Sequence, residues 1–158
     1  MTNIITFSNS QEQIHRWGKK LPDYNINILL PITESFTYEG VIAIVDETSY
    51  KKDIDKIINQ LKKQKIRILL LEENPTFEKA KEFIKSGICG YGNLELNSKQ
   101  LNDAIKVIRD DLTWLAPEFK TELFSDINQK EILQHKRIDN KCKNIIILSD
   151  EIISIMKI

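Results

Sequence analysis

Short runs of apolar residues alternate along the chain with segments in which apolar residues recur at helical spacing. The runs that predict buried strands are NIITF (3–7), NINILL (25–30), VIAIVD (41–46), IRILLL (66–71) and ICGYG (88–92). After the fourth run, the stripe of Phe77, Ala80, Phe83 and Ile84 predicts an amphipathic helix, and similar stripes follow the first, third and fifth runs. Residues 31–40 fit either a short helix or a loop. The pattern therefore predicts strands and helices in alternation.

Continuous apolar strands separated by amphipathic helices indicate a parallel sheet that is covered on both faces. Five such units suit an α/β fold of the flavodoxin-like (βα)5 type, a doubly wound sheet with strand order 2-1-3-4-5. Ligands of these sheets gather at the carboxyl ends of the strands. Asp46 ends the central third strand, so it is either a chemical group at this edge or only the polar start of a turn.

Composition narrows the class of protein. A chain of 158 residues suits one main domain, and the balance of 23 basic and 23 acidic residues gives no bulk attraction to nucleic acid or to an anionic membrane. The start, MTNIITFSNS, lacks the basic and apolar regions of a secretory signal, so we expect a cytoplasmic protein without a membrane span. Cys89 and Cys142 show no metal-binding spacing, which predicts reduced thiols and no zinc site. No catalytic constellation is visible in the sequence.

One stretch carries a family resemblance. The segment SGICGYGNLELNSKQLNDAIKVIRDDLTWLAPEF resembles the last third of a receiver domain from a bacterial response regulator. Gly87, Gly90 and Tyr91 match the turn into the fifth strand of that family, and the polar cap at Ser98 matches the start of its last helix. The ending TWLAPEF resembles the segment that follows the receiver in regulators of the LuxR/NarL kind. The resemblance covers roughly residues 3–119.

The resemblance implies a role for Asp46, because a working receiver phosphorylates its own aspartate at the end of the third strand. That chemistry needs Mg²⁺, which the family binds with an acidic pair at the end of the first strand. Here Ser8 and Asn9 stand in those positions. Glu72 replaces a Ser or Thr that bonds the phosphoryl group, and Leu94 replaces the Lys that pairs with it. The resemblance therefore makes Asp46 the counterpart of the phosphoacceptor, in a site that has lost its partners.

We accordingly expect an atypical, degenerate receiver domain that is not an enzyme and that uses no metal or cofactor. Its predicted function is phosphorylation-independent signalling and dimerisation within a transcription regulator. Two alternatives remain open. The chain is a stand-alone adaptor with a receiver fold, or it is a receiver of two-component signal transduction, a phosphorelay, that still phosphorylates Asp46.

The resemblance also predicts partners. Tyr91 corresponds to an aromatic residue that swings in or out when a receiver is phosphorylated, although a fixed packing role fits it equally well. The fourth helix, fifth strand and fifth helix, residues 76–112, form the face most used for homodimers. Tyr91 and Leu94 are expected on its outer side, where Leu94 would be an exposed apolar residue unless something covers it. A histidine kinase or another protein is a further expected partner.

The chain divides into three predicted parts. Residues 1–119 form the receiver-like domain, residues 120–144 a partly helical linker, and residues 145–158 a C-terminal helix. LSDEIISIMKI, in that helix, resembles the opening of the DNA-binding helix-turn-helix domain of LuxR/NarL-like regulators. Two explanations remain open: the chain is a truncated piece of a longer regulator, or the tail packs on the receiver or on a partner chain. DNA binding would belong to the missing C-terminal domain.

Overall fold

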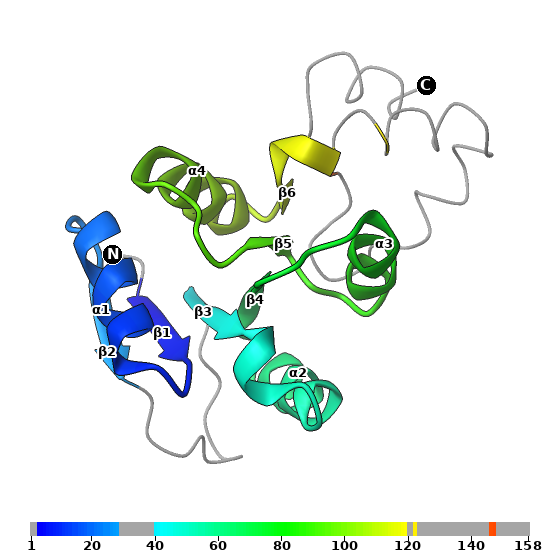
Figure 1. Ribbon diagram of the computed structural model, residues 1–158, viewed down its shortest axis with the longest axis horizontal. Coiled ribbons are helices and arrows are strands. Elements are labelled where there is room, and N and C mark those ends of the chain that lie inside the picture. The colour runs from blue at the N-terminus through cyan, green and yellow to red at the C-terminus, as the bar shows by residue number, and fades with distance from the viewer. Residues whose placement is uncertain (1–2, 29–39, 120–121, 123–145, 148–158) are drawn as a thin grey trace.

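A computed structural model describes residues 3–28, 40–119, 122 and 146–147 of the chain (Figure 1). Nearly all of three predicted segments lies outside the described residues: the ambiguous segment after the second strand, the linker apart from residue 122, and the C-terminal helix. The predicted division into three parts therefore stays a prediction beyond residue 119.

The described strands form one parallel sheet in the order β2-β1-β3-β4-β5-β6-β7. Their bounds are β1 (Asn3–Phe7), β2 (Asn25–Ile28), β3 (Val41–Asp46), β4 (Arg67–Glu72), β5 (Gly90–Asn93), β6 (Thr113–Leu115) and β7 (Ile146–Ile147). The predicted order 2-1-3-4-5 of the flavodoxin-like sheet is confirmed. β4 ends one residue beyond the run predicted for the fourth strand. β5 begins two residues after the start of the run predicted for the fifth strand, because Ile88 and Cys89 precede the paired residues.

The sheet continues past the predicted fifth strand. The backbone N–H of Trp114 donates to the Cys89 carbonyl at 2.8 Å, and that of Ala116 donates to the Tyr91 carbonyl at 3.2 Å, which fixes β6 beside β5. On the other side, β7 pairs with β6 in the register Thr113↔Ile146. β5 is therefore an interior strand. A C-terminal helix was predicted for residues 145–158, but residues 146 and 147 form the strand β7, so the prediction is wrong at these two positions. The other residues of the predicted helix lie outside the described ranges.

Helices connect the strands. The α-helices are α1 (Gln11–Lys20), α2 (Ile54–Lys63), α3 (Phe77–Lys85) and α4 (Ser98–Arg109), and the 3₁₀ helices are η1 (Glu47–Tyr50) and η2 (Pro117–Phe119). α3 and α4 are thus the fourth and fifth helices of the predicted dimer face. Figure 1 shows α1 and α4 on one side of the sheet and α2 and α3 on the other. None of the described helices is long and apolar enough to cross a membrane.

Polar caps set where these helices begin. The side chains of Ser10 and Thr76 accept the N–H groups of Gln13 and Lys79, as expected from their positions before apolar stripes. Tyr50, in the segment that follows the third strand, belongs to η1, and α2 begins only at Ile54. The reason is that Asp46 caps a separate short turn ahead of α2.

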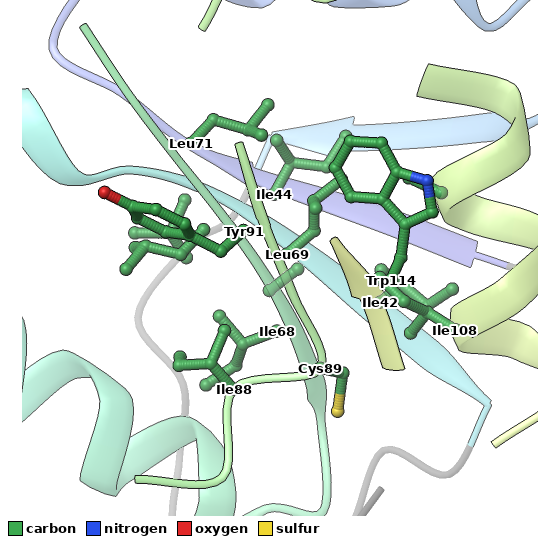
Figure 2. Close-up of a cluster of buried hydrophobic side chains, with 14 of the residues drawn as sticks. Ile42, Ile44, Ile68, Leu69, Leu71, Ile88, Cys89, Tyr91, Ile108 and Trp114 are labelled. Carbon is green, nitrogen blue, oxygen red and sulfur yellow. The ribbon is translucent and has the colours of Figure 1, made fainter. Parts of the chain in front are cut away.

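The core lies between the sheet and the two helix layers. Figure 2 shows Ile44, Leu69, Ile108 and Trp114 gathered around β5. Gly90 permits this packing, because a Cβ atom there would lie 2.8 Å from Leu69 Cδ1 and 2.9 Å from Ile108 Cδ1. Gly90 therefore allows the side chains of Leu69 and Ile108 to pack closely against β5.

Cys89 lies in this core beside β5. Its side chain is buried and disulfide-bonded. The prediction of reduced thiols is therefore wrong for Cys89.

Candidate functional site

The carboxyl ends of the parallel strands bring the predicted site residues to one edge of the sheet. Ser8 and Asn9 follow β1, Asp46 ends β3, Glu72 ends β4 and Leu94 follows β5. A pocket of about 520 Å³ opens at this edge; its lining residues are Ser10, Gln13, Asp46, Thr48, Glu73, Asn93, Leu94 and Glu95. Asp46 and Leu94 are the predicted site residues that line this pocket.

Asp46 acts as the cap of η1. Its side chain is only 4% exposed. The hydroxyl groups of Ser8 and Ser49 each donate to Oδ2 at 2.8 Å, and the backbone N–H of Ser49 donates to Oδ1 at 3.2 Å. Asp46 therefore ends a buried strand and starts the turn η1, as one of the two interpretations predicted, while a chemical role for its carboxylate stays a prediction. Its carboxylate oxygens are both engaged within the protein.

Asn9 completes this network from outside. Its backbone N–H donates to the Ser49 hydroxyl at 3.0 Å, and its side-chain amide donates to the Ser49 carbonyl at 3.0 Å. Ser8 and Asn9, the residues in the place of the acidic pair, therefore tie the end of β1 to η1. Ser49 was not predicted as a site residue, although Asp46 is of a residue type that commonly caps the start of a helix.

The residues present do not fit the Mg²⁺ ion that the receiver fold implies. Mg²⁺ prefers carboxylate oxygens in near-octahedral geometry. Beside Asp46, the other two positions offer a hydroxyl and an amide. The Ser8 hydroxyl already donates to Asp46 and accepts from the Ser10 N–H at 3.1 Å. Among the described residues, no group of three or more His, Cys, Asp or Glu side chains is placed to hold a metal ion.

Glu72 is buried, with 2% of its surface exposed, and it turns toward β5 and α3. Its Oε1 accepts a short hydrogen bond from the Tyr91 hydroxyl, and its Oε2 lies 3.4 Å from Lys79 Nζ. Lys79 was not predicted as a site residue, because only the fold brings the start of α3 next to the end of β4. The carboxylate is thus compensated by a hydroxyl and a half-exposed cation.

Glu47, the first residue of η1, was also missed. Its side chain is 6% exposed and lies close to the carboxyl group of Glu72, while its Oε2 atom has no hydrogen-bond partner. Burial, then the hydrogen bond and the negative charge of Glu72, raises the pKa of Glu47 to about 7. Two buried carboxyl groups therefore share this edge of the sheet. The sequence contained no signal for their pairing, since they lie on different elements.

Tyr91 is completely buried, with 0% of its surface exposed. Its hydroxyl oxygen accepts the Thr76 N–H at 3.1 Å, and its ring centroid lies 5.5 Å from that of Phe83 and 5.9 Å from that of Phe119. Burial and the hydrogen bond with Glu72 raise the pKa of the Tyr91 phenol. The expectation that Tyr91 lies on an outward face is wrong, because η2 and α3 enclose the ring.

Leu94 is also buried, with 9% of its surface exposed, and belongs to the core. Its carbonyl accepts from the side-chain amide of Gln13 at 3.5 Å, which places α1 over this position. The prediction that Leu94 forms exposed apolar surface is therefore wrong. A leucine suits this position because its side chain packs among the buried residues of the core.

No protein-family model and no protein of curated function matches the chain. A solved structure does: a response regulator protein from Burkholderia pseudomallei, described with a phosphorylated aspartic acid, a calcium ion and citrate. The match has a TM-score of 0.56 and a sequence identity of 14%, and it covers 87% of this chain and 85% of that protein. An identity this low supports a likeness of fold. The chain therefore has the fold of a response regulator receiver domain.

Proposed function

We propose that the chain is an atypical receiver domain, a signalling module that works through protein contacts without phosphorylation of Asp46. The observation that carries this proposal is the capping role of Asp46. Its Oδ2 accepts hydrogen bonds from the hydroxyl groups of Ser8 and Ser49, and its Oδ1 accepts one from the backbone N–H of Ser49. A phosphoacceptor needs a carboxylate oxygen free to attack the phosphorus atom, and here that oxygen stabilises the start of η1.

The neighbours of Asp46 support the same proposal. The similar response regulator was solved with a phosphorylated aspartic acid and a calcium ion. In this chain, the hydroxyl and the amide that follow β1 supply no negative charge to hold such a cation. Leu94 is packed in the core and provides no charge to pair with a phosphoryl group. The groups at these positions therefore supply neither the negative charge that holds a cation nor the positive charge that pairs with a phosphoryl group.

The position of Tyr91 also favours a domain that phosphate does not switch. Its hydroxyl is held between Thr76 and Glu72, and its ring stacks on Phe119. The side chain therefore stays inward without any phosphoryl group. A side chain changes between two positions only when a ligand binds one of the two states more tightly. Without a phosphoryl group, Tyr91 has no such ligand.

The partner proposed for this module is a second copy of the chain. The dimer face predicted from the sequence joins α3, β5 and α4. However, β5 is an interior strand, and neither Tyr91 nor Leu94 reaches the surface. What supports the contact is charge. Lys85, Lys106 and Asp110 are exposed on α3 and at the end of α4, and a two-fold axis allows a lysine of one copy to meet an aspartate of the other. A histidine kinase, DNA binding through a further domain, and a cytoplasmic location stay predictions.

Sedimentation tests the dimer. We expect the wild-type chain to sediment as a dimer at tens of micromolar, and the double variant Lys85→Glu, Lys106→Glu to sediment as a monomer, because reversed charges face like charges across the axis. Lys56→Glu, an exposed charge reversal on α2, is the matched control and should stay dimeric. A monomeric wild type, or a double variant that stays dimeric, argues against this face. A form ending at Phe119 that alone is monomeric would assign the contact to the C-terminal tail.

A further inference from the structure

We propose that Glu47 and Glu72 form a proton-controlled latch that holds η1 against the end of β4. Glu47 begins η1 and Glu72 ends β4, and both side chains are more than nine-tenths buried. Two carboxyl groups can hydrogen-bond to each other only when one of them carries a proton. The contact between these two elements therefore depends on a proton at this position.

The positive charges around Glu47 and Glu72 are too few and too exposed to stabilise both carboxyl groups in the ionised form. On α3, Lys79 lies 3.4 Å from Glu72 but has 44% of its side chain exposed. Lys51, just after η1, is exposed and lowers the pKa of Glu47 less than Lys79 does. From β5, Tyr91 donates a hydrogen bond to Glu72 and stays neutral. Losing the shared proton therefore leaves two buried negative charges beside one half-solvated cation.

Glu47 is the member of the pair that can move. Glu72 sits in an interior strand and is fixed by Tyr91 and by Lys79. Glu47 belongs to a four-residue turn, and its Oε2 atom has no hydrogen-bond partner. When Glu47 ionises, its side chain turns to water and η1 loosens. Because Ser49 of η1 supplies two of the hydrogen bonds to Asp46, the latch also controls the cap on Asp46.

The direction of the pH dependence follows from proton linkage. The pKa of Glu47 rises from 4.5 to about 7 on folding, so the folded chain holds a proton that the unfolded chain releases. The latch therefore contributes its full stability below pH 4.5 and loses it progressively as the pH rises to about 7. The closed form of η1 belongs to mildly acidic solution and the loosened form to alkaline solution.

NMR titration of the full chain tests the latch. Between about pH 5 and about pH 9 we expect the side-chain carboxyl signal of Glu47 to titrate with a midpoint near 7, far from the ordinary range of a glutamate. The backbone amide signals of residues 47–50 should shift with the same midpoint. Glu47→Gln, which keeps a hydrogen-bond donor for Glu72, should abolish this amide transition. Glu73→Gln, the neighbouring exposed glutamate, is the matched control and should leave the transition unchanged.

Three results would overturn the latch. The first is a Glu47 carboxyl group that titrates in the ordinary acidic range, which the wild-type chain alone can show. The second is an amide transition at residues 47–50 that persists in Glu47→Gln, because another group would then control η1. A transition that disappears in Glu73→Gln as well would assign it to the general charge of this sheet edge and equally contradict the pair.

Discussion

Replacing Tyr91 with alanine should lower the free energy of unfolding by about 3–5 kcal/mol, the range for truncating a large aromatic side chain in a core. The ring is completely buried and packs on Phe83 and Phe119. Its removal leaves a cavity between β5, α3 and η2 and takes away the hydroxyl that meets Glu72. Urea denaturation followed by circular dichroism gives this quantity directly.

Two further variants separate the contribution of the Tyr91 ring to stability from that of its hydroxyl group and from that of other aromatic residues of α3. Tyr91→Phe should cost less, about 1–3 kcal/mol, because the ring stays while Glu72 loses a buried donor. Phe77→Ala removes a partly buried aromatic at the start of α3, and it should cost less than Tyr91→Ala. A Tyr91→Ala variant as stable as the wild type would mean that the ring moves freely at the surface, as expected of a phosphate-driven switch.

Replacing Asp46 with alanine should also destabilise the protein, by about 2–3 kcal/mol. Loss of a helix cap costs about 0.5–2 kcal/mol. The hydroxyl of Ser8 and the backbone N–H and hydroxyl of Ser49 also lose their acceptor, and a buried group left without its bond costs about 1–3 kcal/mol. Asp46→Asn retains one side-chain oxygen as acceptor, so its loss should be smaller. Thermal and urea unfolding both measure these differences.

The sign of this effect distinguishes the two roles of Asp46. In a site where an acidic pair crowds the phosphoacceptor, removing its charge relieves repulsion and tends to stabilise the fold. Here Asp46 meets only hydrogen-bond donors. Asp53→Ala is the matched control, since Asp53 precedes α2 without a side-chain capping hydrogen bond and is exposed. If Asp46→Ala is as stable as Asp53→Ala, or more stable than the wild type, the capping role is wrong.

The fold could be predicted from the sequence because its strands are continuous apolar runs and its helices begin at polar caps. VIAIVD and IRILLL are buried on both faces, and this excludes a half-exposed antiparallel sheet. β6 escaped prediction because it has three residues and no helix pattern follows it. Pairing of β7 with β6 joins segments that are more than thirty residues apart, and no local pattern encodes such a contact.

The candidate site was predicted in position but only partly in chemistry. Strand ends fix where Asp46 and Glu72 lie, because parallel strands place their carboxyl ends at one edge. The direction of each side chain depends on packing. Glu72 turns to Tyr91 and Lys79, and Leu94 turns into the core beneath α1. Glu47 joins the site only because Asp46 starts a 3₁₀ turn that folds back on β4.

The most direct test of the central claim is the mass of the protein after incubation with acetyl phosphate and Mg²⁺. Because Asp46 is engaged as a cap and its neighbours do not fit Mg²⁺, we expect an unchanged mass for the wild type and for Asp46→Ala alike. A single stoichiometric phosphoryl adduct on the wild type that is absent from Asp46→Ala would contradict it, and would show that the chain is a working receiver.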